Sequence, residues 1–119
     1  MRSSLVCRYL VCSPDLNAHV TLHGGMLLRW IDEAAGMHAR KLTNRVCVTR
    51  SIANIDFISK VKMGEIVLIE TKLEVVGRTS MTFSGAVYED ISQRKIATID
   101  KIVFVAIDNH GNPVKHSLD

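Results

Sequence analysis

Long apolar runs and strong compositional biases are both missing from this chain of 119 residues. Its longest strongly apolar run covers residues 102–107, whereas a helix that crosses a bilayer needs about 20 such residues. The weak apolar stretch in residues 1–12 is interrupted by Arg8 and is followed by no small-residue cleavage site, so it is a poor signal peptide and a better first strand. A disordered chain would contain fewer apolar residues than the 47% found here, and the length suits one domain, residues 1–119. We therefore expect a globular domain without a membrane partner.

Cysteine and excess charge are scarce as well. The three cysteines, Cys7, Cys12 and Cys47, are odd in number and lack the spacing of metal ligands. They predict free thiols in a reducing cytoplasm and no metal site. The formal net charge is only +3, and no cluster of five basic residues or aromatic stacking platform marks a surface for nucleic acid. We expect no nucleic-acid partner.

One helix is predicted in the N-terminal half. Residues 26–41 follow a Gly-Gly pair and contain neither a proline nor a run of β-branched residues. At 3.6 residues per turn, an apolar arc forms from Met26, Leu27, Trp30, Ile31, Ala34, Ala35 and Met37. His38 projects into this arc and is expected to be a core histidine. Arg29, Glu33 and Arg40 lie on the opposite side, which indicates one buried and one wetted face.

After the helix the apolar period changes to two, as in strands. Strand patterns cover residues 45–57, 66–76, 81–87 and 96–107. The buried faces are expected to hold Val67, Ile69, Leu73 and Val75 in one strand and Met81, Phe83 and Val87 in the next. Gly77 is expected in a tight hairpin turn with positive φ. The order strand, helix, four strands predicts an α+β domain in which the helix covers one face of an antiparallel sheet. Apolar residues on more than one face of the strands predict self-association.

The start of the helix contains the most informative residues. Gly24 and Gly25 leave backbone N–H groups at a positive helix end, which can hold an oxyanion or simply form a turn. Asp32 lies at the edge of the apolar arc, where partial desolvation would raise its pKa and make it a better base. Glu33 has the spacing for an ion pair with Arg29. Asp32 is therefore the candidate catalytic carboxylate, and a boundary residue at an oligomer interface is its alternative.

Two polar residues precede these glycines. Asn17 either caps a turn or orients a water or a carbonyl group with its amide. His23 either hydrogen-bonds a ligand or has a structural role. The chain contains no serine nucleophile elbow, phosphate-binding loop, dinucleotide motif or zinc-protease motif, so these chemistries are unsupported.

In their order and spacing these residues resemble the hotdog-fold acyl-CoA thioesterases, in the branch of the cytosolic acyl-CoA hydrolases and their bacterial relatives. The resemblance extends over residues 13–114. Its segments are Pro-Asp-Leu-Asn-Ala at 14–18, Leu-His-Gly-Gly at 22–25, Trp-Ile-Asp-Glu-Ala-Ala at 30–35, Ile-Asp-Phe at 55–57, Gly-Arg-Thr-Ser at 77–80 and Phe-Val-Ala-Ile-Asp at 104–108.

The resemblance implies a hotdog fold, in which a sheet of five to six antiparallel strands wraps one long central helix. It implies a cytoplasmic homodimer, assembled further into a hexamer as a trimer of dimers, with active sites at the dimer interface.

The resemblance also implies a role for each site residue. Asp32 would act as base or nucleophile, and Asn17 from the other subunit would position water or substrate. The Gly25 N–H would polarise the thioester carbonyl. The remaining substrate contacts would be His23, Gly24, Arg78, Thr79 and Ser80, the last three near the coenzyme A arm. The acyl-CoA would be the substrate, with no cofactor.

Two departures concern substrate preference. Val20 stands where relatives commonly have glycine, and Lys60 ends a segment where relatives often have a basic residue and proline directly after the phenylalanine. A non-catalytic acyl-CoA binder is the main alternative function. A hotdog enoyl-CoA hydratase is a weaker one, since Asp15 to His19 only faintly echo its motif.

Overall fold

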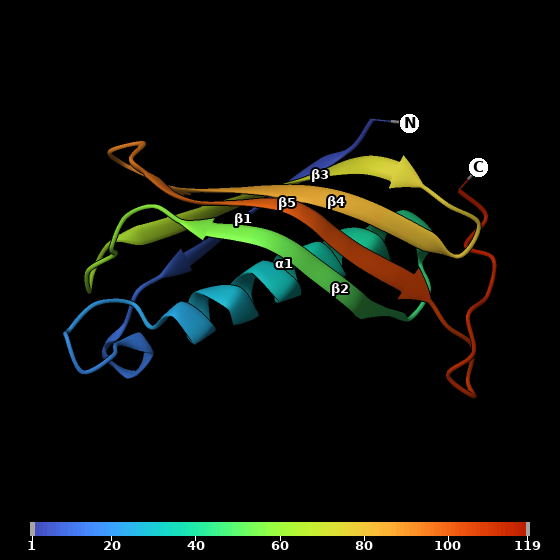
Figure 1. Cartoon of the computed structure of the whole chain (residues 1–119), viewed down its shortest axis with the longest axis horizontal. Coiled ribbons are helices and arrows are strands. Elements are labelled where there is room, and N and C mark those ends of the chain that lie inside the picture. Colours follow the sequence, from blue (N-terminus) through green and yellow to red (C-terminus); the bar gives the residue numbers. More distant parts are fainter. Residues whose placement is uncertain (1, 119) are drawn as a thin grey trace.

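The computed structural model describes residues 2–118 and shows one long helix packed against a five-stranded antiparallel sheet (Figure 1). Its elements are β1 (Ser4–Leu10), the 3-10 turn η1 (Ser13–Asp15), α1 (Gly24–Thr43), β2 (Cys47–Phe57), β3 (Ile66–Val76), β4 (Ser80–Glu89) and β5 (Lys95–Ala106). The strand order is β1-β3-β4-β5-β2, and every neighbouring pair is antiparallel. The expected α+β class and helix-wrapping sheet are confirmed.

The helix α1 lies across the concave face of the sheet and buries one side. Its buried residues are Leu27, Trp30, Ile31, Ala34, Ala35, His38 and Ala39. Met37, expected in the apolar arc, is instead 46% exposed. It lies four residues after Glu33 and three before Arg40, so it shares the polar side of the helix. The helix ends at Asn44, whose left-handed conformation (φ 52°) lets its N–H reach the Arg40 carbonyl.

Two expectations about the strands are wrong. Val75 is 59% exposed, because the pairing of β3 with β4 shifts register between Leu73 and Val75 and turns the later side chain outward. Gly77 does not have positive φ, a conformation that among the described glycines only Gly64 and Gly111 adopt. A Cβ at this position would lie 2.5 Å from the Ser80 Oγ, so a larger residue would require the Ser80 side chain to move.

The buried histidine of the helix is confirmed as a core residue. His38 is 2% exposed and packs against the Phe83 ring, with ring centroids 4.7 Å apart. Its Nε2 lies 2.8 Å from the Ser3 Oγ, and its Nδ1 lies 2.8 Å from the Thr71 Oγ1. Both ring nitrogens are therefore satisfied although the ring is buried, and the side chain links α1 to β3 and to the residue just before β1.

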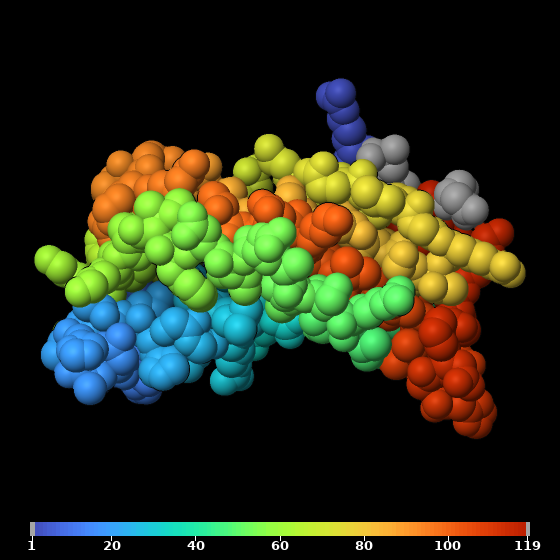
Figure 2. Space-filling model, viewed as in Figure 1, coloured from blue at the N-terminus to red at the C-terminus, as the bar shows by residue number. Residues whose placement is uncertain are grey.

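The strand β2 is an edge of the sheet and has many exposed side chains. Its ends and flanks expose the apolar Val46, Val48, Phe57 and Ile58. Figure 2 shows β2 and the segment after it, in green, lying on the visible face beside the helix. In the described residues, no helix is long and apolar enough to cross a membrane.

Candidate active site

The helix α1 and the strand β2 bring the candidate carboxylate into contact with a residue that the sequence did not single out. Asp32 is half-buried, and its Oδ1 accepts a 2.5 Å hydrogen bond from the Thr49 Oγ1. Among residues 2–118, Asp32 forms no ion pair. Its neighbour Glu33 lies 3.3 Å from the Arg29 Nε on the exposed side, as expected. The two adjacent carboxylates thus differ: a neutral hydroxyl orients one, and a cation pairs with the other.

Asn17 organises the loop before the helix. Its Oδ1 accepts from the backbone N–H of His19 (2.9 Å) and of Thr21 (3.2 Å), and its Nδ2 donates to the Thr21 Oγ1 (3.1 Å). This confirms its turn-capping role, and one amide hydrogen is left over for a ligand or water. Within this loop Val20 has φ 62°, a left-handed conformation that a β-branched residue rarely adopts. A glycine, the residue that the resemblance leads us to expect here, would take that conformation without strain, whereas Val20 takes it at a cost.

The His23 side chain accepts the hydrogen bond of the Gly25 N–H, the group that was expected to polarise the substrate. It is the N-cap of α1, and its Nδ1 accepts a 2.9 Å hydrogen bond from the Gly25 N–H. Its own carbonyl accepts from Met26 and Leu27. No hydrogen bond within residues 2–118 uses the Gly24 N–H, which is the first of the helix. In this structure the available helix-start donor is therefore Gly24 rather than Gly25.

The two glycines border different clefts. Gly24 and Asn17 line a cleft of about 390 Å³. Its apolar lining comes from Leu22, Leu27, Phe57, Ile58 and Val61, and Lys60 also borders it. Gly25 and His23 line a second cleft of about 330 Å³. The Gly24 side therefore offers an apolar space beside a free N–H and an amide side chain, which suits an acyl group and its carbonyl oxygen.

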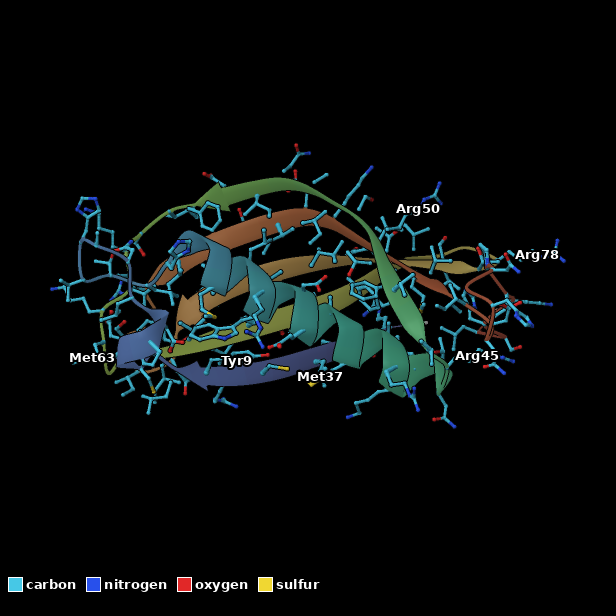
Figure 3. All side chains as sticks on the ribbon, turned by 90° about the horizontal axis from the view of Figure 1, so that it is seen from below. Tyr9, Met37, Arg45, Arg50, Met63 and Arg78 are labelled. Carbon is cyan, nitrogen blue, oxygen red and sulfur yellow. The ribbon has the colours of Figure 1, made fainter. Side chains whose placement is uncertain are left out.

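A third cleft contains both the threonine that holds Asp32 and one of the expected coenzyme A contacts, Thr79. This cleft of about 380 Å³ is lined by Thr49, Arg50 and Thr79, together with the C-terminal turn at Gly111 and Pro113. Thr79 therefore borders the same cleft as the threonine that holds Asp32. Arg78 is exposed, and Figure 3 shows it projecting beyond the end of the sheet.

The expected site residues fall into two groups within one chain. Thr49, which holds Asp32, lines one cleft together with Thr79, and Asn17 with Gly24 lines another. No hydrogen bond among the described residues joins Asp32 to Asn17. Sequence reasoning missed Thr49, because its link to Asp32 depends on how β2 packs beside α1, which residue spacing does not reveal.

The described residues contain no group of three or more His, Cys, Asp or Glu side chains that could hold a metal ion. Cys7, Cys12 and Cys47 are all free thiols, as expected.

Comparison with known proteins decides the family. The sequence pattern of the thioesterase superfamily matches residues 19–95. This chain belongs to the thioesterase superfamily. It is 34% identical over 103 residues to the acyl-CoA thioester hydrolase YkhA of Bacillus subtilis, a protein described as uncharacterised. That match covers 84% of this chain and only 60% of the relative. It is 28% identical over 118 residues to the acyl-CoA thioester hydrolase YciA of Escherichia coli, which covers 94% of this chain and 89% of the relative.

Solved structures of this superfamily have the same fold. A hexameric acyl-CoA thioesterase superposes with a TM-score of 0.84 at 31% identity, covering 94% of this chain and 74% of that one. The acyl-CoA hydrolase of Staphylococcus aureus, solved with butyryl coenzyme A, coenzyme A and coenzyme A disulfide, gives a TM-score of 0.81 at 29% identity. It covers 94% of this chain and 68% of that one. The expected family and hotdog fold are confirmed.

Proposed function

We propose that this protein hydrolyses acyl-CoA thioesters to the free acid and coenzyme A. The observation that carries the proposal is the half-buried Asp32 carboxylate, which a neutral hydroxyl rather than a cation holds in place. A carboxylate that is fixed in direction and not neutralised by a cation can accept a proton from water or attack a carbonyl carbon. A site with so few groups can hydrolyse a thioester because a thiolate is a good leaving group.

Variants of the Staphylococcus aureus hydrolase support the choice of residues. Structures of that enzyme exist with one asparagine, one aspartate and one threonine each replaced by alanine. The aspartate follows the asparagine by 15 residues, and the threonine follows the aspartate by 17. Asn17, Asp32 and Thr49 have the same two spacings. This agreement supports Thr49 as a third site residue beside the two that the sequence proposed.

The chemistry assigns a role to each group. Thr49 fixes one oxygen of Asp32, so that the other oxygen faces water or the substrate. In the general-base route, water forms a bond to the thioester carbonyl carbon and gives its proton to Asp32. The carbon–sulfur bond then breaks and coenzyme A leaves as the thiolate. In the nucleophilic route, an Asp32 oxygen bonds to the carbonyl carbon, the carbon–sulfur bond breaks and coenzyme A leaves as the thiolate. Water then hydrolyses the resulting anhydride to the free acid and restores the Asp32 carboxylate. Both routes place negative charge on the carbonyl oxygen, which needs a donor.

The helix start supplies that donor. The Gly24 N–H is available at the positive end of α1, whereas the Gly25 N–H becomes available only when the His23 ring turns away. The spare amide hydrogen of Asn17 is in the same cleft as Gly24 and can hold the water or the carbonyl group.

The assembly and location form part of the same proposal. A homodimer would bring Asp32 of one subunit to Asn17 and Gly24 of the other, which fits the absence of any bond between them among the described residues of one chain. Hexameric relatives support a trimer of dimers. Arg78, Thr79 and Ser80 would contact the coenzyme A arm, no cofactor would take part, and three free thiols suit the cytoplasm.

A non-catalytic acyl-CoA binder is the second candidate. The observation in its favour is the Gly25 N–H, which the His23 ring already occupies. A binder would keep the apolar cleft and the coenzyme A contacts but would release no thiol.

The deciding experiment follows free thiol released from a panel of acyl-CoAs, from acetyl to palmitoyl with one aromatic member. We expect turnover by the wild type and a loss of about 100-fold or more in Asp32→Asn, which keeps the shape of the side chain but cannot accept the proton. Glu33→Gln is the matched control, because Glu33 is paired with Arg29 on the exposed side, and it should keep full activity. Binding without cleavage by the wild type would favour the binder. Full turnover by a folded Asp32→Asn would contradict the assignment of the carboxylate.

A further inference from the structure

The turn between β3 and β4 is held from outside by the C-terminal segment. Within the turn, the Gly77 N–H donates to the Ser80 carbonyl at 2.9 Å. The segment after β5 adds a bond from the His116 N–H to the Arg78 carbonyl at 3.3 Å. At the end of β5, the Ala106 N–H donates to the Thr79 carbonyl at 2.9 Å. Each of the three carbonyls at residues 78–80 therefore has a partner.

The imidazole of His116 is buried beside the turn, and both of its ring nitrogens have hydrogen-bond partners. It is 2% exposed, and its Nδ1 accepts a 3.1 Å hydrogen bond from the Leu118 N–H. A backbone N–H can only donate, so Nδ1 carries no proton and the proton of the neutral ring is on Nε2. Nε2 lies 3.0 Å from the Ser80 carbonyl oxygen and donates to it. The neighbours of the ring thus fix its tautomer and its direction.

These bonds use the backbone of the turn and leave its side chains available. The guanidinium of Arg78 forms no ion pair with the described residues, and it projects beyond the end of the sheet (Figure 3). Thr79 borders the cleft that also contains Thr49. A fixed backbone with free polar side chains is the arrangement expected where a ligand is held, because less freedom is lost on binding.

We propose that His116 is a positioning residue for the coenzyme A part of the substrate. Its backbone N–H holds the Arg78 carbonyl and its imidazole holds the Ser80 carbonyl. The turn fixed in this way presents the Arg78 guanidinium and the Thr79 hydroxyl toward the phosphate-bearing arm, for which an arginine fork is well suited. This inference rests on the proposed acyl-CoA thioesterase function. It adds a residue that lies outside the motifs of the sequence and touches neither the reacting atoms nor Asp32.

The test compares two thioesters of the same acid. Butyryl-CoA contains the phosphate-bearing arm, and butyryl-N-acetylcysteamine lacks it. For His116→Ala we expect KM for butyryl-CoA to rise about tenfold, the effect of losing one or two ordinary hydrogen bonds. We expect kcat to stay the same, and kcat/KM for the truncated thioester not to change. His116→Gln, whose amide can still donate to the Ser80 carbonyl, should restore most of the lost affinity. His110→Ala, in the nearby exposed turn, is the matched control and should change nothing.

A double-mutant cycle sharpens the test. If His116 acts through Arg78, then adding His116→Ala to Arg78→Ala should raise KM less than His116→Ala does alone. An unchanged KM for butyryl-CoA in His116→Ala would overturn the proposal. An equal fall of kcat/KM on both thioesters would also overturn it, because a general loss of structure does not distinguish the two substrates.

A wild type that cleaves neither thioester would count against the proposed function. The positioning role would then be read from the dissociation constant of free coenzyme A, measured by calorimetry. A tenfold weaker value in His116→Ala supports the role, and an equal value contradicts it.

Discussion

At the scale of single residues, Thr49 has the closest contact with the candidate carboxylate. Its hydroxyl donates to Asp32 at 2.5 Å and fixes which way the carboxylate points. Thr49→Val keeps the volume and the β-branch but removes the donor, so we expect kcat for acyl-CoA hydrolysis to fall about tenfold, the effect of one lost hydrogen bond to a charged group. Thr49→Ser keeps the hydroxyl and should stay close to wild type.

The measurement is steady-state thiol release, with the thermal unfolding midpoint of each variant as the check on folding. A stable Thr49→Val enzyme with wild-type kcat would show that the contact does not orient the carboxylate during the reaction.

The first residue of the helix allows a test of a single backbone N–H. Gly24→Pro removes the N–H that would hold the carbonyl oxygen, at the helix position where proline is best tolerated. His23 before it is extended (φ −65°, ψ 129°), as a residue before proline must be. Gly24→Ala keeps the N–H, and its Cβ would meet nothing within 4 Å. We expect kcat to fall about 100-fold in the proline variant and to be unaffected in the alanine variant.

Equal thiol-release rates in these two Gly24 variants would point to Gly25 as the donor. His23 would then have to turn away during each reaction cycle.

At the scale of elements, His38 links α1 to β1 and β3 through Ser3 and Thr71. Burial, reinforced by the nearby Lys41, lowers the pKa of His38 below its ordinary value of 6.5. The unfolded chain therefore takes up this proton at a higher pH than the folded chain does. The stability that comes from the neutral ring is complete above about pH 6.5 and is lost as the pH falls from there through the lower folded pKa.

We therefore expect the free energy of unfolding to fall between pH 7 and pH 5, by at most about 1.4 kcal/mol per pH unit from this one group. The measurement is urea unfolding at several pH values. His38→Gln can keep both hydrogen bonds without titrating, and its stability should depend less on pH in this range. An identical pH dependence in both proteins would mean that other groups cause it. Hydrogen bonds lower the pKa values of the Glu65 and Glu89 carboxyl groups. The stability that these two groups contribute is therefore lost only below about pH 4.5 and does not affect the range tested here.

At the scale of the whole molecule, the strand order leaves one edge of the sheet open to contact with another chain. The order leaves β2 at an edge of the sheet, with apolar side chains exposed at Val46, Val48, Phe57 and Ile58. An exposed apolar edge strand is a surface for pairing with another chain. If two chains meet there, Asp32 of one can approach Asn17 of the other.

Mixing two inactive variants tests this arrangement. Asp32→Ala and Asn17→Ala should each be inactive alone. After unfolding and refolding together in equal amounts, half of the dimers contain one chain of each kind, and one of their two sites is intact. We expect about a quarter of the wild-type rate. Sedimentation of the mixture checks that oligomers have re-formed, and no recovery of activity in re-formed oligomers would place both residues in the same chain's site.

The sequence by itself determined the features that depend on neighbours along the chain. The helix, the five strands and the exposed Arg29–Glu33 pair follow from apolar period and from side chains one turn apart. The same pattern predicts Asp32 rather than Glu33 as the catalytic carboxylate. The same local information failed at Val75, where a register shift between two strands turns the side chain outward.

The tertiary structure alone decided the contacts between distant segments. It placed β2 at the edge of the sheet, brought Thr49 to Asp32 and directed the buried His116 ring to Ser80. Likewise, the His23 ring covers Gly25 and leaves Gly24 free only because its side chain folds back onto the helix start. Local periods set which face of an element is apolar, but many strand orders and packings bury the same faces. The choice among them depends on the packing of the whole chain at once. The contact between Thr49 and Asp32 exists because of that packing.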